Sequence, residues 1–406
     1  SLAPPRKNAM TDRTAIRAAF DENGLLAEAR AKTGLDEFGD DAFRAPLRVL
    51  LESLREEAPL NAVGIAMLRG RILESLMARL RTEDWIRRHP EIERERIVAP
   101  IVVVGQTRTG TTMLQRLLAS DPRHHGPLWW EVRFPAPLPG TRWDAPDPRI
   151  PIAQAEVAGI LAADPEQASI HPWDAQAPDE EIMLLEHSFL SHVPESFANL
   201  PSYRAWIDAQ DWTPAYETLR QFLQFLQWQK RQRGALRERW VLKTPGHLGY
   251  LDTLLRVFPG ALIVQTHRDP VQTIPSAASL NRSLWRLSSD DVDEVECARQ
   301  WQERMAWAVR RCLASREKIP ERQIADVWFL DALAKPLEVV AQIYARFEIE
   351  LTAAARAALE QWLRDNRRDK RPPHDYTLAE FGLSEAEIRA VFADYRRRFI
   401  QPRLSS

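Results

Sequence analysis

Eight residues from Gly105 to Thr112 combine residue types that together can bind an anion. They read Gly-Gln-Thr-Arg-Thr-Gly-Thr-Thr, follow a β-branched run and precede a helical pattern. The two glycines allow a tight turn that points backbone N–H groups inward, and the start of the following helix adds unpaired donors and partial positive charge. Arg108 and the threonine hydroxyls complete the pocket. The loop is predicted to bind a phosphate-like anion, and a plain glycine turn with a surface arginine is the alternative.

The two glycines also have the G-x-x-x-x-G spacing of an ATP-binding P-loop, but Thr111 stands where that motif requires lysine. The cation, Arg108, lies inside the loop instead. Because a P-loop lysine contacts the β- and γ-phosphates, its absence predicts a shorter anion, one phosphate with one further charged group. A nucleotide kinase is the main rival, and it would need an aspartate for magnesium, for which Asp331 is the candidate.

A second phosphate site is predicted at the segment Thr266-His267-Arg268-Asp269-Pro270, which follows an apolar run. Asp269 is suited to cap a helix, and Pro270 to its first turn. Ser276 lies seven residues after Asp269, so two helical turns return its hydroxyl to the same face. Arg268 and Ser276 could therefore hold one dianionic phosphate together. A simple capped helix start is the alternative.

The elements that must position these loops alternate between strand and helix patterns. Short apolar, β-branched runs predict buried parallel strands, and apolar residues at three- and four-residue spacing predict helices between them. This alternation predicts an α/β fold of P-loop type, a parallel sheet flanked by helices. The predicted strands are Ile101–Val104, Trp240–Leu242, Ala261–Val264 and Val327–Leu330, and the intervening helices include 113–118 and 248–255.

Around this core we expect an added helical N-terminal region over residues 1–97, packed on an α/β domain over 98–406. An insert at 127–178 is rich in tryptophan and proline and has little periodicity, and long irregular insertions are usually functional. Helical patterns return at 180–232 and again in the tail from Leu337 to Phe399.

The composition excludes several classes of protein. The 406 residues are 45% hydrophobic and 28% charged with a formal net charge of −2, so no global field attracts nucleic acid or anionic lipid. There is no apolar run long enough to span a membrane, and Ser1–Ala9, before a plausible start at Met10, lacks the core of a signal peptide. Cys297 and Cys312 are expected to be buried thiols, and the chain is expected in the cytoplasm.

With these motifs in place, the chain resembles the sulfotransferases that use 3′-phosphoadenosine 5′-phosphosulfate (PAPS). The [K/R]-[S/T]-G-T-T loop of that family is matched by Arg108–Thr112, and its arginine and serine eight residues apart by Arg268 and Ser276. The stretch Val241–Leu248 and the tail His374–Leu383 are similar to bacterial stand-alone members, so the resemblance spans residues 25–400. It implies that Arg268 and Ser276 bind the 3′-phosphate, and that the 5′-phosphosulfate is bound by Gln106, Thr107, Arg108, Thr109, Gly110, Thr111 and Thr112.

Sulfuryl transfer needs an in-line nucleophile, a base for its proton and cations on the leaving phosphate. Arg108 and Lys243 are the expected cations. Glu131 is the first candidate base, because Trp129 and Trp130 would desolvate it and because the resemblance implies a glutamate in this region.

Two histidines remain open as the base. The cytosolic branch of the family has a histidine at the position of Pro245, and the nearest one here is His247; His171, in the insert, is the third candidate. The basic stretch Arg367–Arg371, which includes Lys370, resembles a loop that closes over the 3′-phosphate. No metal is expected, because the sequence has no compact metal cluster, and His124–His125 is interpreted as a surface turn.

The product would be adenosine 3′,5′-bisphosphate, and the acceptor a small, partly apolar compound with a hydroxyl or amine. The insert and the helices at 180–232 are expected to build its pocket. The sequence is compatible with a homodimer. A non-catalytic interaction protein, whose 14 tryptophans form a docking surface, is a third class to be separated by experiment.

Overall fold

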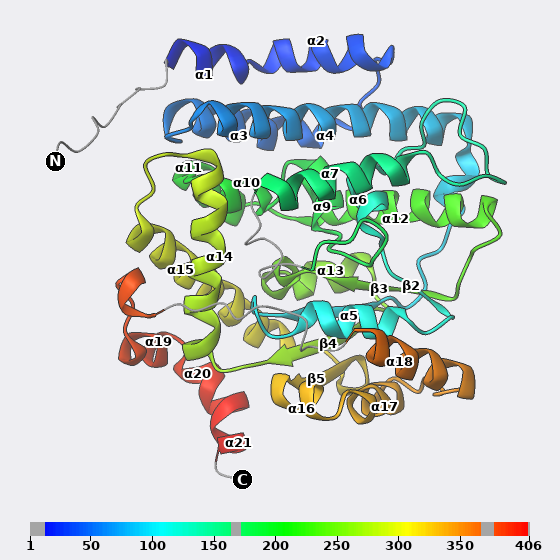
Figure 1. Ribbon diagram of the computed structural model, residues 1–406, viewed down its shortest axis with the longest axis vertical. Helices are drawn as coiled ribbons and strands as arrows, with labels where there is room; N and C mark the ends of the chain where they lie inside the picture. The colour runs from blue at the N-terminus through cyan, green and yellow to red at the C-terminus, as the bar shows by residue number, and fades with distance from the viewer. Residues whose placement is uncertain (1–12, 164–171, 367–376, 405–406) are drawn as a thin grey trace.

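The computed structural model describes residues 13–163, 172–366 and 377–404, with a five-stranded parallel sheet at its centre (Figure 1). The strand order is β2-β3-β1-β4-β5. Val103 of the central strand lies opposite both Lys243 and Val264, so the carboxyl ends of three strands meet at one edge. The predicted parallel sheet is confirmed. The strands are β1 (Ile101–Gly105), β2 (His124–His125), β3 (Arg239–Lys243), β4 (Leu262–His267) and β5 (Ile324–Trp328).

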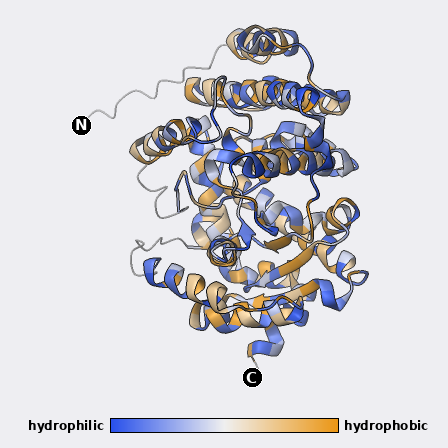
Figure 2. Ribbon diagram, turned by 90° about the vertical axis from the view of Figure 1, so that its right-hand side faces the viewer, coloured by the Kyte–Doolittle hydropathy of each residue, from blue (hydrophilic) through white to orange (hydrophobic). Residues whose placement is uncertain are grey.

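Helices cover both faces of this sheet. Successive side chains of a strand point to opposite faces, and those of β1 pack into two different apolar clusters: Val102 and Val104 into one, Ile101 and Val103 into the other. All four are fully buried. Figure 2 shows the strands as hydrophobic ribbons in the interior, with mixed hydrophobic and hydrophilic residues on the helices around them.

The N-terminal residues form a layer of helices at the end of the molecule far from the C-terminus (Figure 1). In α3 the apolar residues Leu47, Leu50, Leu51 and Leu54 are all buried, and they belong to the same cluster as Val102 of the sheet. This layer therefore shares its core with the sheet. Its helices are α1 (Arg13–Ala19), α2 (Glu22–Thr33), α3 (Arg44–Glu56) and α4 (Ala62–Arg88).

The remaining helices surround the sheet and extend to the C-terminus. Between β1 and β3 lie α5 (Thr111–Ala119), α6 (Trp129–Arg133), α7 (Arg149–Ala163), α9 (Ile182–Leu185), α10 (Val193–Phe197), α11 (Pro201–Asp208) and α12 (Thr213–Gln232). After β3 come η4 (Pro245–Gly249), α13 (Leu251–Val257), α14 (Pro270–Ser288) and α15 (Glu294–Arg316). After β5 come α16 (Phe329–Ala334), α17 (Pro336–Arg346), α18 (Ala353–Asp365), α19 (Glu385–Val391), α20 (Ala393–Tyr395), the π-helix η8 (Arg396–Ile400) and α21 (Gln401–Leu404).

The insert and the last strand both differ from the prediction. The insert contains the 15-residue helix α7 and is not irregular throughout. The last strand runs from Ile324 to Trp328, whereas Val327–Leu330 was predicted, and Phe329 already begins α16. Asp326 interrupts the apolar pattern, but its carboxylate is paired with His267 and Arg316, so it is accommodated in the strand.

The interpretation of His124 and His125 as a surface turn is wrong, because they form the edge strand β2 and are buried. Nε2 of His125 accepts the backbone N–H of Arg237 at 2.7 Å, and Nδ1 of His124 lies 2.9 Å from the carbonyl oxygen of Leu118. Each imidazole thus has one backbone partner inside the protein, whereas Nε2 of His124 has no hydrogen-bond partner among the described residues.

The two cysteines are buried free thiols, as predicted. Burial raises the pKa of both Cys297 and Cys312 to about 12, so neither thiol is poised to react. In the part of the chain that the structure describes, no helix is both long and apolar enough to cross a membrane.

The buried histidines predict that the fold loses stability in mild acid. Burial lowers the pKa of His125 and of His187 to about 3, whereas an unfolded histidine titrates near about 6.5. As the pH falls from about 6.5 towards 3, the unfolded chain therefore takes up protons that the fold excludes, and each group costs about 1.4 kcal/mol per pH unit. The melting temperature should fall steadily between pH 6.5 and 4.5.

His187→Leu is the matched variant, because the ring of His187 packs 4.7 Å from that of Phe222 and neither nitrogen has a hydrogen-bond partner among the described residues. This variant should show a shallower loss of melting temperature with acid than the parent protein. If the melting temperatures of the two proteins fall equally with pH, His187 does not contribute to the loss of stability in acid.

Candidate active site

The loop predicted to bind an anion lies at the carboxyl end of the central strand. Gly105 is the last residue of β1 and Thr111 the first of α5. Between them, Arg108 has φ 69° and Gly110 has φ 85°, both in the left-handed region. A backbone of this kind points N–H groups into a concave site that favours anions. The hydroxyl of Thr109 donates to the Gln106 carbonyl at 2.7 Å and holds the loop closed.

Arg108 occupies a left-handed conformation that glycine adopts without cost. Such a conformation costs a larger residue on the order of 1 kcal/mol or more, and strained residues of this kind cluster at functional sites. An arginine at this position is therefore expected to use its side chain.

Gly105→Ala is expected to weaken donor binding. A Cβ at this position would lie 2.2 Å from Oγ1 of Thr266 and 2.8 Å from Oγ1 of Thr109. These two hydroxyls are hydrogen-bonded to each other at 2.6 Å, so neither can move without breaking the contact between loop and strand β4. Titration with adenosine 3′,5′-bisphosphate should give a dissociation constant at least about tenfold higher than that of the parent. An unchanged dissociation constant would contradict this role for Gly105. Gly70→Ala is a control on helix α4, where a Cβ meets nothing within 4 Å.

The structure brings the two predicted phosphate sites into direct contact. Nε of Arg108 donates to the hydroxyl of Ser276 at 3.0 Å, and Nη1 of Arg268 donates to the carbonyl oxygen of Arg108 at 3.0 Å. Asp269 caps α14 through the backbone N–H of Val271, as predicted. One continuous cradle results, in which Arg108 and Arg268 carry the positive charge.

The predicted cation Lys243 ends strand β3 and is fully buried. Its Nζ donates to Oε1 of Glu180 at 2.5 Å, and the side chain of Glu180 remains 25% exposed. Sequence reasoning missed Glu180, whose only local signal was an acidic cluster at the end of the proline-rich insert. The pair presents a buried cation and a partly accessible carboxylate beside each other.

The segment that carries Glu180 is bound to the helix of the loop. The side-chain amide of Gln115 donates to the Asp179 carbonyl at 2.9 Å, and Nε of Arg116 donates to the Pro178 carbonyl at 3.0 Å. Both donors lie on α5, which begins at Thr111. Glu180 therefore lies between this helix and the carboxyl end of β3.

Behind this pair lies a buried chain of hydrogen bonds through His247, one of the predicted candidate bases. Its Nε2 lies 2.7 Å from Oε1 of Glu181, and its Nδ1 lies 2.8 Å from the hydroxyl of Tyr216. Burial raises the pKa of Tyr216 well above its ordinary value, so this phenol keeps its proton. The other carboxylate oxygen of Glu181 accepts the backbone N–H of Lys243 at 2.8 Å. His247 thus holds Glu181, and through it the end of strand β3.

The structure does not bring Glu131 to the loop. Its carboxylate pairs with Lys230 and accepts the backbone N–H of Leu128 at 3.0 Å. Nζ of Lys230 lies over the ring of Trp240, which is three residues before Lys243 and thus towards the amino end of β3. His171, Lys370 and Arg371 lie outside the described residues.

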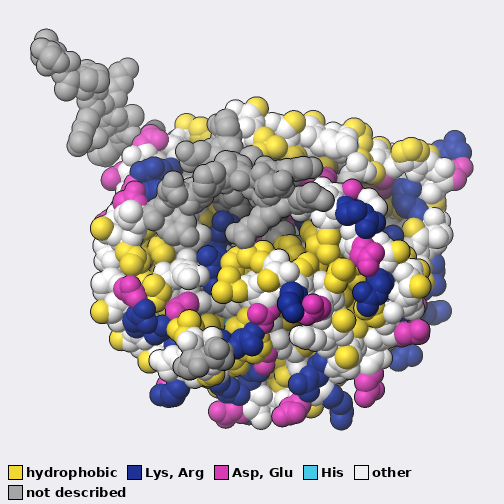
Figure 3. Space-filling view, turned by 60° about the horizontal axis from the view of Figure 1, so that its bottom comes forward, with side chains coloured by type: hydrophobic (Ala, Val, Ile, Leu, Met, Phe, Trp, Pro, Cys, Tyr) yellow, Lys and Arg dark blue, Asp and Glu magenta, His cyan; other side chains and the backbone are white. Residues whose placement is uncertain are grey.

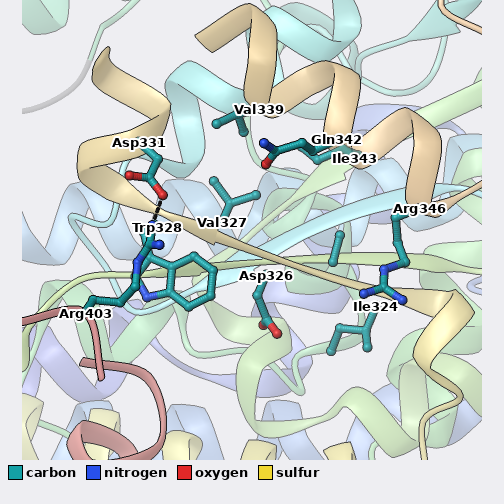
Figure 4. Close-up of a pocket in the computed structure, with 11 residues that line it drawn as sticks. Ile324, Asp326, Val327, Trp328, Asp331, Val339, Gln342, Ile343, Arg346 and Arg403 are labelled. Atoms are coloured by element: carbon teal, nitrogen blue, oxygen red, sulfur yellow. Dashed lines mark hydrogen bonds and ion pairs between the residues drawn. The ribbon is translucent and has the colours of Figure 1, made fainter. Parts of the chain in front are cut away.

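A cavity of about 440 Å³ lies elsewhere, along strand β5 (Figure 4). It is lined by residues of β5, α16, α17 and α21 and by none of the loop residues 105–112. Among the residues that the structure describes, no group of three or more His, Cys, Asp or Glu side chains is arranged to hold a metal ion.

Comparison with known proteins agrees with this geometry. A sequence model described as "Sulfotransferase family" matches residues 100–353. The omega-hydroxy-beta-dihydromenaquinone-9 sulfotransferase Stf3 of Mycobacterium bovis is 30% identical over 194 residues, which are 46% of this chain and 46% of that protein. The alignment thus spans about half the length of this curated relative.

Two solved structures are similar over nearly the whole chain. Sulfotransferase STF1 from Mycobacterium tuberculosis is 33% identical with a TM-score of 0.81, covering 92% of this chain and 98% of its own. Sulfotransferase STF9 from Mycobacterium avium is 28% identical with a TM-score of 0.84, and the match covers 94% of this chain and 97% of STF9. The matched family region includes the loop, Glu180, Lys243, Arg268 and Ser276, and we conclude that this chain belongs to the sulfotransferase family.

Proposed function

We propose that this protein transfers the sulfuryl group of PAPS to a hydroxyl of a small, partly apolar acceptor. The observation that carries the proposal is the direct contact of Arg108 with Ser276 and Arg268, which joins two anion sites. PAPS has two anionic ends of this kind, the 5′-phosphosulfate and the 3′-phosphate. The loop residues 106–112 would bind the first, and Arg268 and Ser276 the second. Lys370 and Arg371 are expected to add positive charge to the site that binds the 3′-phosphate.

In the reaction, the acceptor oxygen attacks sulfur in line while the bond from sulfur to the bridging oxygen of the 5′-phosphate breaks. Negative charge accumulates on that phosphate, and we assign Arg108 and Lys243 as the cations that stabilise it. The acceptor loses one proton, and the product is adenosine 3′,5′-bisphosphate. We assign no metal to the reaction, because a sulfuryl group carries less charge than a phosphoryl group.

We assign the role of base to Glu180. Its carboxylate is partly exposed and lies next to Lys243, which would neutralise it between turnovers. Glu131 and His247 remain alternatives, but both are buried: Lys230 and Leu128 hold Glu131, and Glu181 and Tyr216 hold His247. Glu180 also has two partners, Lys243 and Thr244, but its side chain is 25% exposed. Of the three, only Glu180 combines accessibility with contact to a predicted cation of the site.

The acceptor class is inferred from the segment around Glu180 and from the relatives. Glu180 lies two residues before α9, the first of the helices over residues 182–232 that we propose as the acceptor side. The curated relative Stf3 is named for a hydroxylated menaquinone. An apolar molecule with a terminal hydroxyl therefore fits the proposal better than a polymer.

Transfer of radiolabelled sulfate tests the function directly. The protein is incubated with PAPS labelled on sulfur, together with hydroxylated isoprenoid quinones, sterols and simple phenols in detergent. We expect label in an apolar product with the quinone or another hydroxylated lipid, and none with Arg108→Ala. Binding of the donor without transfer to any acceptor in the panel would instead support a non-catalytic binding protein.

A further inference from the structure

The proposed 3′-phosphate site contains a carboxylate that would oppose its ligand. Asp269 directly follows Arg268, and its Oδ1 caps α14 by accepting the backbone N–H of Val271 at 3.1 Å. An anion next to a dianionic phosphate is repelled by Coulomb interaction, and this repulsion is strong where solvent is partly excluded. The capping aspartate therefore needs a compensating charge.

Arg396 supplies that charge from the other end of the chain. Its Nε donates to Oδ1 of Asp269 at 3.0 Å and its Nη2 to Oδ2 at 2.9 Å, a bidentate pair. The side chain of Arg396 is only 5% exposed and that of Asp269 only 17%. Such planar, two-bond pairs are the geometrically most specific ion pairs of proteins. Arg396 is the first residue of the π-helix η8, and π-helical turns occur frequently at functional sites.

The neighbours of Arg396 hold the same turn from its other side. The hydroxyl of Tyr395 lies 3.0 Å from Nδ1 of His267, the residue before Arg268, and the ring of Phe399 stacks on His267 with centroids 4.2 Å apart. Nε2 of His267 lies 2.8 Å from Asp326 of β5. Burial favours the neutral carboxyl of Asp326, but hydrogen bonds from His267 and Arg316 outweigh it and hold its pKa at about 2.

The rest of the C-terminal segment is attached to β5 and α16. The indole N–H of Trp328 donates to the Phe399 carbonyl at 2.8 Å, and Arg403 pairs with Asp331, both of which line the cavity (Figure 4). Figure 3 shows Lys and Arg side chains interspersed with hydrophobic and acidic ones on the face turned towards these C-terminal elements. The segment is thus anchored on both sides of the turn that carries Arg268.

We propose that Arg396 is a positioning residue for the donor nucleotide: it neutralises Asp269 and fixes the turn of Arg268, so the C-terminal segment sets the affinity for the 3′-phosphate. This inference rests on the proposed function, because it takes Arg268 as a 3′-phosphate ligand. It adds a residue that does not itself touch the nucleotide.

Calorimetric titration of the full chain with adenosine 3′,5′-bisphosphate tests the inference. Arg396→Met should weaken binding about tenfold, because it leaves the charge of Asp269 beside the phosphate. Asp269→Asn, which keeps a capping side chain, should recover most of the lost affinity when combined with Arg396→Met. Arg397→Met, which removes the neighbouring exposed arginine, should bind as the parent does.

Steady-state kinetics separates positioning from a general structural role. Arg396→Met should raise KM for PAPS about tenfold and leave both kcat at saturating donor and KM for the acceptor close to the parent values. If Arg396→Met does not fold, Arg396→Lys and Tyr395→Phe replace it, each with a smaller expected rise in the same KM.

The outcomes are distinguishable. A parent protein that does not bind the bisphosphate at all overturns the proposed function. A parent that binds, with Arg396→Met equal to it, overturns only the role of Arg396. A double variant no better than the single one overturns charge neutralisation by Arg396.

Discussion

Replacing Arg108 by alanine is expected to lower kcat about 100-fold or more, the scale of losing one donor that acts on the transition state. The residue lies inside the donor loop, donates to Ser276 and has its backbone held in the left-handed region. The measurement is initial rates of sulfate transfer at saturating PAPS. The loss should appear in kcat as well as in KM for the donor, because charge on the leaving phosphate grows during the reaction.

Arg108→Lys is the matched variant for this prediction. It keeps a positive charge but loses the fixed fork of the guanidinium, so it should retain more activity than alanine and less than the parent. If the alanine variant keeps parental kcat, Arg108 does not act on the transition state and the assignment of the loop to the sulfuryl end is contradicted.

Glu180→Gln should lower kcat by about 10²- to 10⁴-fold, the usual contribution of a positioned general base. Glutamine has nearly the same shape and still offers an oxygen to Lys243, but it cannot accept the acceptor's proton. The affinity for adenosine 3′,5′-bisphosphate should stay within about threefold of the parent, because Glu180 is not among the residues proposed to bind the nucleotide. Such a change is smaller than the tenfold that corresponds to about 1.4 kcal/mol.

Glu131→Gln is the comparison that decides between the two carboxylates. Its partner Lys230 lies near the amino end of β3, so this variant should lose stability and keep most of its kcat. The reverse pattern, with Glu131→Gln inactive and Glu180→Gln active, would assign the base to Glu131. If His247→Asn is inactive while both glutamine variants keep their activity, the buried His247 is favoured as the base.

The meeting of the loop with Arg268 and Ser276 could be predicted because each lies within a short stretch whose geometry is local. A strand, a glycine turn and a helix start specify the loop around Arg108, and two helical turns separate Ser276 from the helix cap Asp269. Both stretches follow parallel strands, and parallel strands end at the same edge of a sheet. This is enough to predict that the two stretches lie at one edge. The contact between Arg108 and Ser276 confirms that they come together.

Contacts across long sequence separations could not be predicted in this way. Glu180 reaches Lys243 only because the insert returns to α5 through Gln115 and Arg116. Glu131 follows the loop helix in sequence, yet the fold places its carboxylate at Lys230, far along the chain. His125 is buried for the same kind of reason, since its acceptor nitrogen is matched by a backbone N–H more than 100 residues away.

The most direct test of the donor site compares adenosine 3′,5′-bisphosphate with ATP by calorimetric titration, each with and without magnesium. We predict that the bisphosphate binds in the micromolar range without magnesium, that ATP binds at least about 100-fold more weakly, a difference of about 2.7 kcal/mol, and that magnesium does not reverse the order. Preferential, magnesium-dependent binding of ATP would contradict the account and identify the loop as a kinase-type phosphate site.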